Sequence, residues 1–170
     1  MSTGKASIAA ELGEALRAYR AAVDDFDREL ARLLGINQTD VHCLEFLLDD
    51  VPEAGPGLLA DRLGITTGAV TTMLDRLERV GYLSRTTHPT DRRKTIVRAT
   101  EQARQLSSRL TGPLTHSADQ ALLDGYTTAE ADLIVEFIRR AGAITNRHVT
   151  RLRAETGPHP TIASRRQPVS

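Results

Sequence analysis

The 170-residue chain has no tryptophan and a single cysteine, Cys43, and these shortages exclude several classes of protein. One cysteine cannot form an internal disulfide or a thiolate metal cluster within one chain, which agrees with a reducing compartment. No uninterrupted apolar run occurs, because acidic residues such as Glu11, Glu14 and Asp24 lie among the first apolar positions. We therefore expect a globular cytoplasmic protein with neither a signal peptide nor a membrane span.

Sequence motifs that carry catalysis are also missing. The chain contains no G-x-x-x-x-G-K-[ST] loop, no G-x-G-x-x-G, no H-E-x-x-H and no G-x-S-x-G. The five histidines are dispersed, and none forms an i, i+4 pair. His42 and His116 could meet beside Glu45 as metal ligands, but their spacing favours a structural or surface role. We expect no enzyme activity, no catalytic residue, no cofactor and no metal site.

The chain has no net charge, with 22 Lys and Arg against 22 Asp and Glu, yet the charges are unevenly distributed. Residues 1–56 hold 5 basic against 11 acidic residues, a net charge of −6. Residues 57–99 hold 8 against 4, a net charge of +4, and residues 100–170 hold 9 against 7. The middle segment therefore carries the positive excess that a phosphate backbone attracts.

Helical periodicity dominates both ends of the chain. From Leu12 to Leu33 apolar residues recur at alternating steps of four and three, a heptad-type stripe that predicts one long helix. Gly35 should end this helix, and Asn37 with Asp40 suits the start of a second one. The inner face of the second helix is expected to contain Cys43, Leu44, Leu47 and Leu48.

Two further helices are expected after residue 99. Thr100 can cap the first, which Gly112 and Pro113 should kink or interrupt. Thr127 and Glu130 form a T-x-x-E capping box for the second. The apolar side of this last helix is expected to contain Ile134, Phe137, Ile138, Ala141 and Ile144.

The long end helices have more apolar stripe than one small domain can cover, so we expect them to pack against a second copy of the chain. An ordinary intramolecular bundle is the alternative. The expected division is a dimerisation region in residues 1–36 and 100–153 and a separate domain in residues 37–99. The proline-containing tail, residues 154–170, is expected to be disordered.

Residues 57–79 have the pattern of a helix-turn-helix. Leu59, Ala60 and Leu63 share one face of a short helix, Gly64 supplies the tight turn, and Thr66 caps the next helix. The buried side of that helix is expected to contain Val70, Met73, Leu74 and Leu77. Its outward side is expected to contain Gly68, Thr72, Asp75, Arg76 and Arg79. A solvated, capped amphipathic helix would show the same pattern.

A basic hairpin should follow directly. Tyr82–Thr87 and Lys94–Ala99 are rich in β-branched residues and flank a polar turn that carries Arg92 and Arg93. Two strands behind a helix-turn-helix make a winged helix, whose loop tip can reach phosphates or a narrow minor groove. The fold class is therefore mainly α with a small β-wing: a winged helix-turn-helix DNA-binding domain plus a helical dimerisation region. The DNA contacts are expected from Thr66, Thr67, Gly68, Thr71, Thr72, Arg76, Arg92 and Arg93.

The segment ADRLGITTGAVTTMLDRLERVGYLSRTTHPTDRRKTIVRAT resembles the core of the MarR family of bacterial winged-helix transcription regulators. The resemblance is carried by the A-x-x-L-G-I turn, by the segment from Asp75 to Tyr82, and by the D-x-R wing at Asp91 and Arg93. The chain departs from the family at Thr72, where a basic residue is common, and at Ala99, where leucine is commoner before threonine.

This resemblance implies a homodimer that binds double-stranded DNA at a pseudo-palindromic operator, mostly as a repressor. It also implies that Arg93, with Asp91, is the wing arginine, and that Asp75 pairs with Arg93 or with Arg85 to support the wing. Many relatives are released from DNA by small phenolic or other lipophilic ligands, or by oxidation. The pocket implied for such a ligand contains Tyr19, Val23, Phe26, His42 and Phe46, although core packing also explains these residues.

Two alternatives remain. Cys43 could sense oxidants, but no basic residue lies near it in the sequence, so an inert buried thiol is favoured. The winged helix could also be a protein-interaction module without DNA binding, which zero net charge and the threonine-rich helix favour. The +4 segment and the intact wing favour DNA.

Overall fold

The computed structural model describes the backbone of residues 3–156 and their side chains, except those of residues 3, 117–120 and 156. The elements in chain order are α1 (Thr3–Leu34), α2 (Gln38–Glu45), η1 (Phe46–Asp50), α3 (Pro56–Leu63), α4 (Thr67–Arg79), β1 (Leu83–Thr87), β2 (Thr95–Ala99), α5 (Glu101–Leu123) and α6 (Thr128–Thr156). The sequence predicts a disordered tail over residues 154–170. This prediction is wrong for residues 154–156, which continue α6, and residues 157–170 lie outside the described part. No helix in the described part is long and apolar enough to cross a membrane.

The first helix, α1, ends where the sequence predicts. Gly35 follows Leu34 with a φ of 67°, a left-handed conformation that favours glycine. Near this end Leu30 is buried and Phe26 and Leu34 are half-buried, whereas Leu33 is 56% exposed. The step of four from Leu30 to Leu34 keeps both side chains on the inner face of α1.

Asn37 precedes α2 as its N-cap residue, as expected. Its backbone N–H donates to Oδ2 of Asp40 at 3.0 Å, so the carboxylate satisfies a backbone donor at the start of the helix. The chain then widens into η1, a π-helical turn that also brings Phe46 into the core. The buried side chains here are Asp40, Val41, Cys43, Leu44, Phe46 and Leu47, and Leu48 is half-buried.

The helix-turn-helix consists of α3, Gly64 and α4. Gly64 has φ 67° and ψ 31° and makes the turn, and Thr66 Oγ1 accepts the backbone N–H of Ala69 at 3.2 Å to cap α4. The buried faces are those expected from helical periodicity. They contain Leu59, Ala60, Val70, Met73, Leu74 and Leu77, none more than 9% exposed.

The predicted hairpin is present, with each strand one residue shorter at its start. β1 and β2 are antiparallel and pair from Leu83 opposite Ala99 to Thr87 opposite Thr95. The backbones of Ala54 and Val97 exchange hydrogen bonds of 3.1 and 2.8 Å. The loop before α3 is therefore fixed to the wing.

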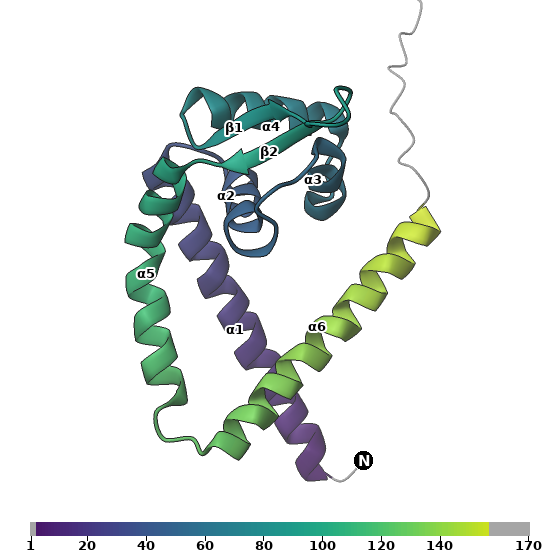
Figure 1. Ribbon diagram of the computed structural model, residues 1–170. Helices are drawn as coiled ribbons and strands as arrows, with labels where there is room; N and C mark the ends of the chain where they lie inside the picture. The colour runs from purple at the N-terminus through teal and green to yellow at the C-terminus, as the bar shows by residue number, and fades with distance from the viewer. Residues whose placement is uncertain (1–2, 157–170) are drawn as a thin grey trace, which may run out of the picture. The chain divides into compact units, whose positions relative to one another are not determined.

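Figure 1 shows α2, α3 and α4 gathered beside the hairpin, and one hydrophobic cluster joins these elements. Leu30 and Ala31 of α1 and Ala103 of α5 belong to the same cluster. The winged-helix core therefore extends past the boundaries expected at residues 36/37 and 99/100. The chain divides into two compact units, Met1–His116 and Ser117–Ser170, so the division falls within α5.

The caps of α5 and α6 are as predicted. Thr100 Oγ1 accepts from the Ala103 N–H at 3.2 Å, and the Thr127–Glu130 capping box forms bonds of 2.7 to 3.3 Å. Pro113 does not interrupt α5, which continues to Leu123. A proline removes a single N–H donor, and the rest of the helix retains its ladder of backbone bonds.

Replacing Gly64 by alanine should lower the free energy of unfolding by about 1–2 kcal/mol, because a left-handed backbone crowds a Cβ. Gly68 is the control, since it lies inside α4 with nothing within 4 Å of a Cβ placed there. Gly68→Ala should raise the free energy of unfolding by about 0.5–1 kcal/mol through helix propensity. Urea unfolding measures both values, and equal effects of the two substitutions would contradict this account of the turn.

Candidate nucleic-acid interface

The first two turns of α4 expose only short side chains. The set consists of Thr67, Gly68, Ala69, Thr71 and Thr72, together with the cap residue Thr66 just before the helix. Thr71 Oγ1 donates to the carbonyl of Thr67 at 3.1 Å, and Thr72 Oγ1 donates to that of Gly68 at 3.2 Å. Both hydroxyl hydrogens are therefore bonded within the helix. The surface allows close approach of another molecule, such as a DNA groove.

Arg76, predicted to contact DNA, lies one turn beyond Thr72 and is paired within the fold. Its Nε and Nη2 both donate to the carboxylate of Asp40, each at 2.6 Å. The Asp40 side chain is fully buried and that of Arg76 is 30% exposed. The guanidinium is therefore held against α2 by a bidentate, charge-assisted pair. Sequence reasoning identified Asp40 only as a helix-start residue and missed this role.

The wing is fixed to α4 by Arg85 of β1. Its guanidinium pairs with Asp75 at 2.7 Å and with Glu78 at a shorter distance. Of the two partners expected for Asp75, the structure contains Arg85; Arg93 pairs with Asp91 instead. The hydrogen bond from Arg85 lowers the pKa of Glu78. The sequence reasoning missed Glu78, although it lies three residues after Asp75, on the same side of the helix.

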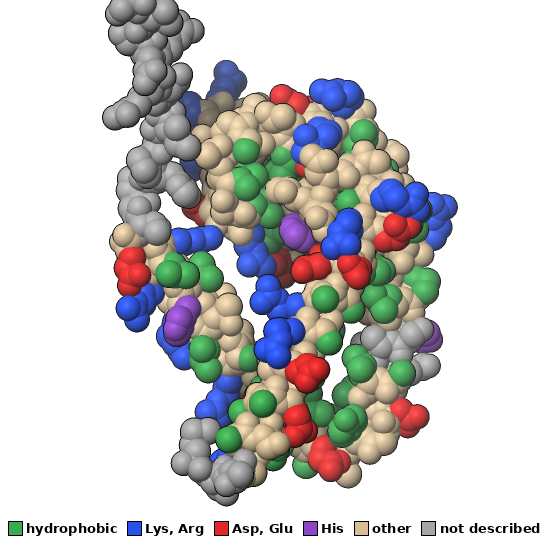
Figure 2. All heavy atoms as spheres, turned by 180° about the vertical axis from the view of Figure 1, so that it is seen from behind, with side chains coloured by type: hydrophobic (Ala, Val, Ile, Leu, Met, Phe, Trp, Pro, Cys, Tyr) green, Lys and Arg blue, Asp and Glu red, His purple; other side chains and the backbone are tan. Residues whose placement is uncertain are grey.

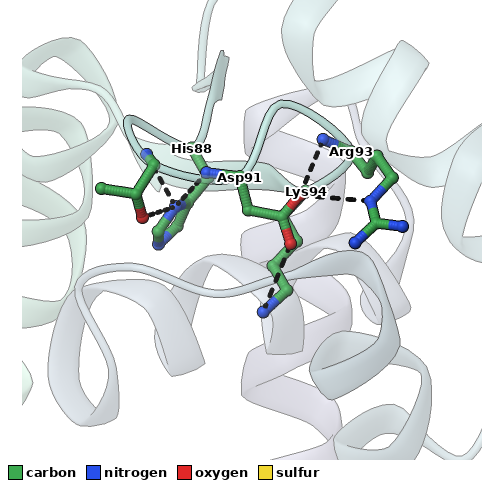
Figure 3. A network of polar contacts seen from close by, with 5 residues as sticks. His88, Asp91, Arg93 and Lys94 are labelled. Atoms are coloured by element: carbon green, nitrogen blue, oxygen red, sulfur yellow. Dashed lines mark hydrogen bonds and ion pairs between the residues drawn. The ribbon is translucent and has the colours of Figure 1, made fainter.

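The tip of the wing is held by a network of short-range bonds (Figure 3). Asp91 Oδ1 accepts from the backbone N–H of Arg93 at 3.2 Å and from its Nε at 3.4 Å. His88 Nδ1 accepts the backbone N–H groups of Thr90 and Asp91, each at 3.3 Å. The backbones of His88 and Lys94 close the turn. Sequence reasoning also missed this role of His88.

The wing tip presents its positive charge to solvent. The Arg93 side chain is 92% exposed, and Arg92 is exposed as well. Beside them a surface hollow of about 610 Å³ is lined by His88, Arg93 and Lys94 on one side and by residues 53–58 on the other. Exposed arginines on a fixed loop suit contacts with phosphate oxygens.

Of the five residues expected to line a ligand pocket, two lie together at the surface. His42 and Phe46 line a surface hollow, and Arg62 lies over the Phe46 ring at 5.3 Å. Tyr19 of α1 is 68% exposed and is not among the residues that line this hollow. His42 Nε2 lies 3.2 Å from the buried carboxylate of Asp27, which gives this histidine a structural partner.

A separate cavity, lined in part by Tyr82, is too small for a phenolic molecule. It has a volume of about 20 Å³ and is lined mainly by apolar side chains of α1, α2 and α5, with Glu45 among them. This is room for about one water molecule. Burial raises the pKa of Glu45, and the charges of Asp27 and Asp49 contribute in the same direction.

Cys43 is the inert buried thiol that the sequence favours. It has no solvent exposure, and burial followed by the charge of Asp40 raises its pKa to about 12. Nucleophilic attack by cysteine requires the thiolate, which such a pKa keeps scarce near neutrality.

A helix-turn-helix followed by a two-stranded hairpin with a basic tip defines a winged-helix protein. The MarR family model matches residues 36–95. The chain is 34% identical over 131 residues to the Bacillus subtilis protein YcgE, described as an uncharacterized HTH-type transcriptional regulator, and the match covers 75% of this chain and 82% of YcgE. The chain belongs to the MarR family of transcriptional regulators.

Solved structures share the fold at lower sequence identity. FabT of Streptococcus pneumoniae, solved in complex with DNA, is 22% identical with a TM-score of 0.66, and the match covers 81% of this chain and 96% of FabT. Wild-type MarR of Escherichia coli, in its apo form, is 22% identical with a TM-score of 0.55 over 76% of this chain and 96% of MarR. Both support the winged-helix architecture.

Replacing Asp40 by alanine should lower the free energy of unfolding by roughly 2–3 kcal/mol, since it removes a helix cap and leaves Arg76 without its carboxylate. The partial exposure of Arg76 keeps the loss at the lower end for a broken buried pair. Asp50 is the control, because its pair with Arg62 is more than half exposed on both sides. Asp50→Ala should cost under about 1 kcal/mol.

Thermal and urea unfolding of both variants measure this difference. A loss for Asp40→Ala no larger than that for Asp50→Ala would show that the buried pair does not stabilise the fold. Asp40→Asn should give an intermediate loss, because an asparagine oxygen can still accept the Asn37 N–H.

Proposed function

We propose that this chain is a DNA-binding transcriptional regulator that binds a two-fold symmetric operator as a homodimer. The observation that carries the proposal is the combination, within one unit, of a small-residue face on α4 and an exposed basic wing. The first part of α4 enters the major groove, where Thr66, Thr67, Gly68, Thr71 and Thr72 approach the bases and phosphates. The relatives are described as transcriptional regulators. We propose that this chain likewise acts in the cytoplasm by binding DNA and not by catalysis.

The wing supplies contacts that do not depend on sequence. Arg92 and Arg93 lie at an exposed tip, and Asp91 and His88 hold the turn that carries them. Their guanidinium groups neutralise phosphates beside the groove that α4 enters. Because members of the MarR family are mostly repressors, we propose repression as the outcome of this binding.

The dimerisation region of the proposal is formed by the helices at both ends of the chain. Figure 2 shows hydrophobic side chains at the surface of these long helices. On α6, large apolar residues at helical spacing are between 39% and 54% exposed in a single chain: Ile134, Phe137, Ile138 and Ile144. Apolar patches of this kind mark association surfaces, and a second copy of the chain covers this one.

Replacing Arg92 and Arg93 together by alanine should weaken binding to all DNA sequences and reduce the salt dependence of the affinity. The slope of log K against log salt should become shallower by about 0.9 for each phosphate that the variant no longer neutralises. The measurement is a fluorescence-anisotropy titration at several salt concentrations. The control replaces Arg28 and Arg32 together by alanine, since they are exposed arginines of α1 that pair within their own helix. An unchanged slope in the wing variant would remove the wing from the proposal.

Replacing Ile138 by glutamate should weaken dimerisation about 100-fold or more, because the interface would have to bury a carboxylate. Ile138 is 54% exposed in the single chain. The control is Ala143→Glu, which adds the same charge on the opposite side of α6, at about 100° per residue. Sedimentation velocity at micromolar concentration measures the association. Wild-type protein that sediments as a monomer there would contradict the dimer.

A further inference from the structure

We call the exposed side of the first two turns of α4 its reading face. This face contains no long side chain that can donate a hydrogen bond. A guanine is read in the major groove by donors, most often by the two N–H groups of one arginine, which bond its O6 and N7. The first arginine on this face is Arg76, and its Nε and Nη2 are both bonded to buried Asp40. A contact of this arginine edge with guanine would leave the Asp40 carboxylate buried without its partner, which is costly.

Two of the four exposed threonines at this end of α4, Thr71 and Thr72, cannot act as donors in their present geometry. Thr71 and Thr72 are exposed, and each hydroxyl hydrogen is bonded to a carbonyl one turn back in α4. Each side chain therefore offers DNA two things, a methyl group and an oxygen that can only accept. Both edge atoms of guanine in the major groove are acceptors, so neither group matches guanine; its partner cytosine has an N4 donor for the oxygen but no C5 methyl group.

Thymine and adenine match these groups. Thymine has a methyl group at C5 that an apolar side chain can contact, and its adenine partner has an N6 amino donor. The bond within the helix engages each threonine hydroxyl with the α4 backbone, so the methyl group is the part of the side chain without a hydrogen-bond partner. Gly68 and Ala69 beside the threonines have no bulk that would hold the helix away from the bases.

We propose that Thr71 and Thr72 select thymine by contact between methyl groups, a contact that neither base of a G·C pair can provide. This inference rests on the proposed function, because it specifies which bases the bound helix recognises. Thr71 and Thr72 are then the specificity-determining residues of the operator half-site, while the wing arginines contribute affinity for any sequence.

The test begins with a binding-site selection on the full-length protein. Each thymine of the selected half-site is then replaced in turn by deoxyuridine, which removes only the C5 methyl group. Removal of one buried methyl group should weaken wild-type binding about three- to fivefold at one or two positions per half-site. Binding to the unmodified duplex is the reference in each titration.

Two variants of Thr72 separate the methyl group from the hydroxyl. Thr72→Ser keeps the hydroxyl and should lose the sensitivity to uracil at one position, while Thr72→Val keeps a methyl group and should retain it. Thr150→Ser is the matched control, because Thr150 is exposed on α6 and makes the same backbone bond, to Asn146 at 3.0 Å. It should bind like the wild type.

The outcomes separate the two levels of the proposal. Sensitivity to uracil that Thr72→Ser abolishes and Thr72→Val retains supports thymine selection. Specific binding with no uracil-sensitive position, or with a required guanine whose preference changes in Thr72→Val, overturns the inference and leaves the regulator function intact. A selection that enriches no sequence overturns the proposed function itself.

Discussion

The ion pair between Asp40 and Arg76 determines how α4 is presented. The Asp40 carboxylate lies in the core with no solvent exposure, and a buried charge is tolerated only when its partner and hydrogen bonds are in place. Here the two oxygens accept two N–H groups of Arg76 and the backbone N–H of Asn37. One carboxylate therefore fixes the start of α2 and the middle of α4 together, and its charge adds to the larger effect of burial in raising the pKa of the neighbouring Cys43 thiol.

The other side of α4 is held by a different kind of contact. Arg85 of β1 bonds Asp75 and Glu78, and both carboxylates are 40% or more exposed. Salt screens such exposed pairs, whereas the buried pair at Asp40 is largely protected. The contact between α2 and α4 at Asp40 therefore depends on burial, and the contact of Arg85 with α4 depends more on ionic conditions. Leu83 and Val97 of the wing also belong to the hydrophobic cluster that contains the buried face of α4.

Local features were predictable from the sequence. The turn at Gly64, the caps at Thr66 and Thr100, the capping box at Thr127 and the hairpin all follow from patterns within a few residues. Arg76 shows where such reasoning fails: on a helical wheel it lies at the border of the buried face, and its partner is 36 residues away. Neither helical spacing nor residue type decides whether a border arginine points to solvent or to a carboxylate in the core.

The position of Arg76 also explains how a chain without net charge can suit DNA. In the proposed complex, affinity comes from arginines at the wing tip, which are exposed and contact phosphates of any sequence. In the same proposal, discrimination comes from uncharged threonines, because the arginine nearest to them is bound to Asp40. Phosphate contacts release counterions and methyl contacts do not, so added salt weakens all binding while leaving the ratio between sequences nearly unchanged. Affinity and specificity thus depend on separate chemistry, carried by the wing and by α4.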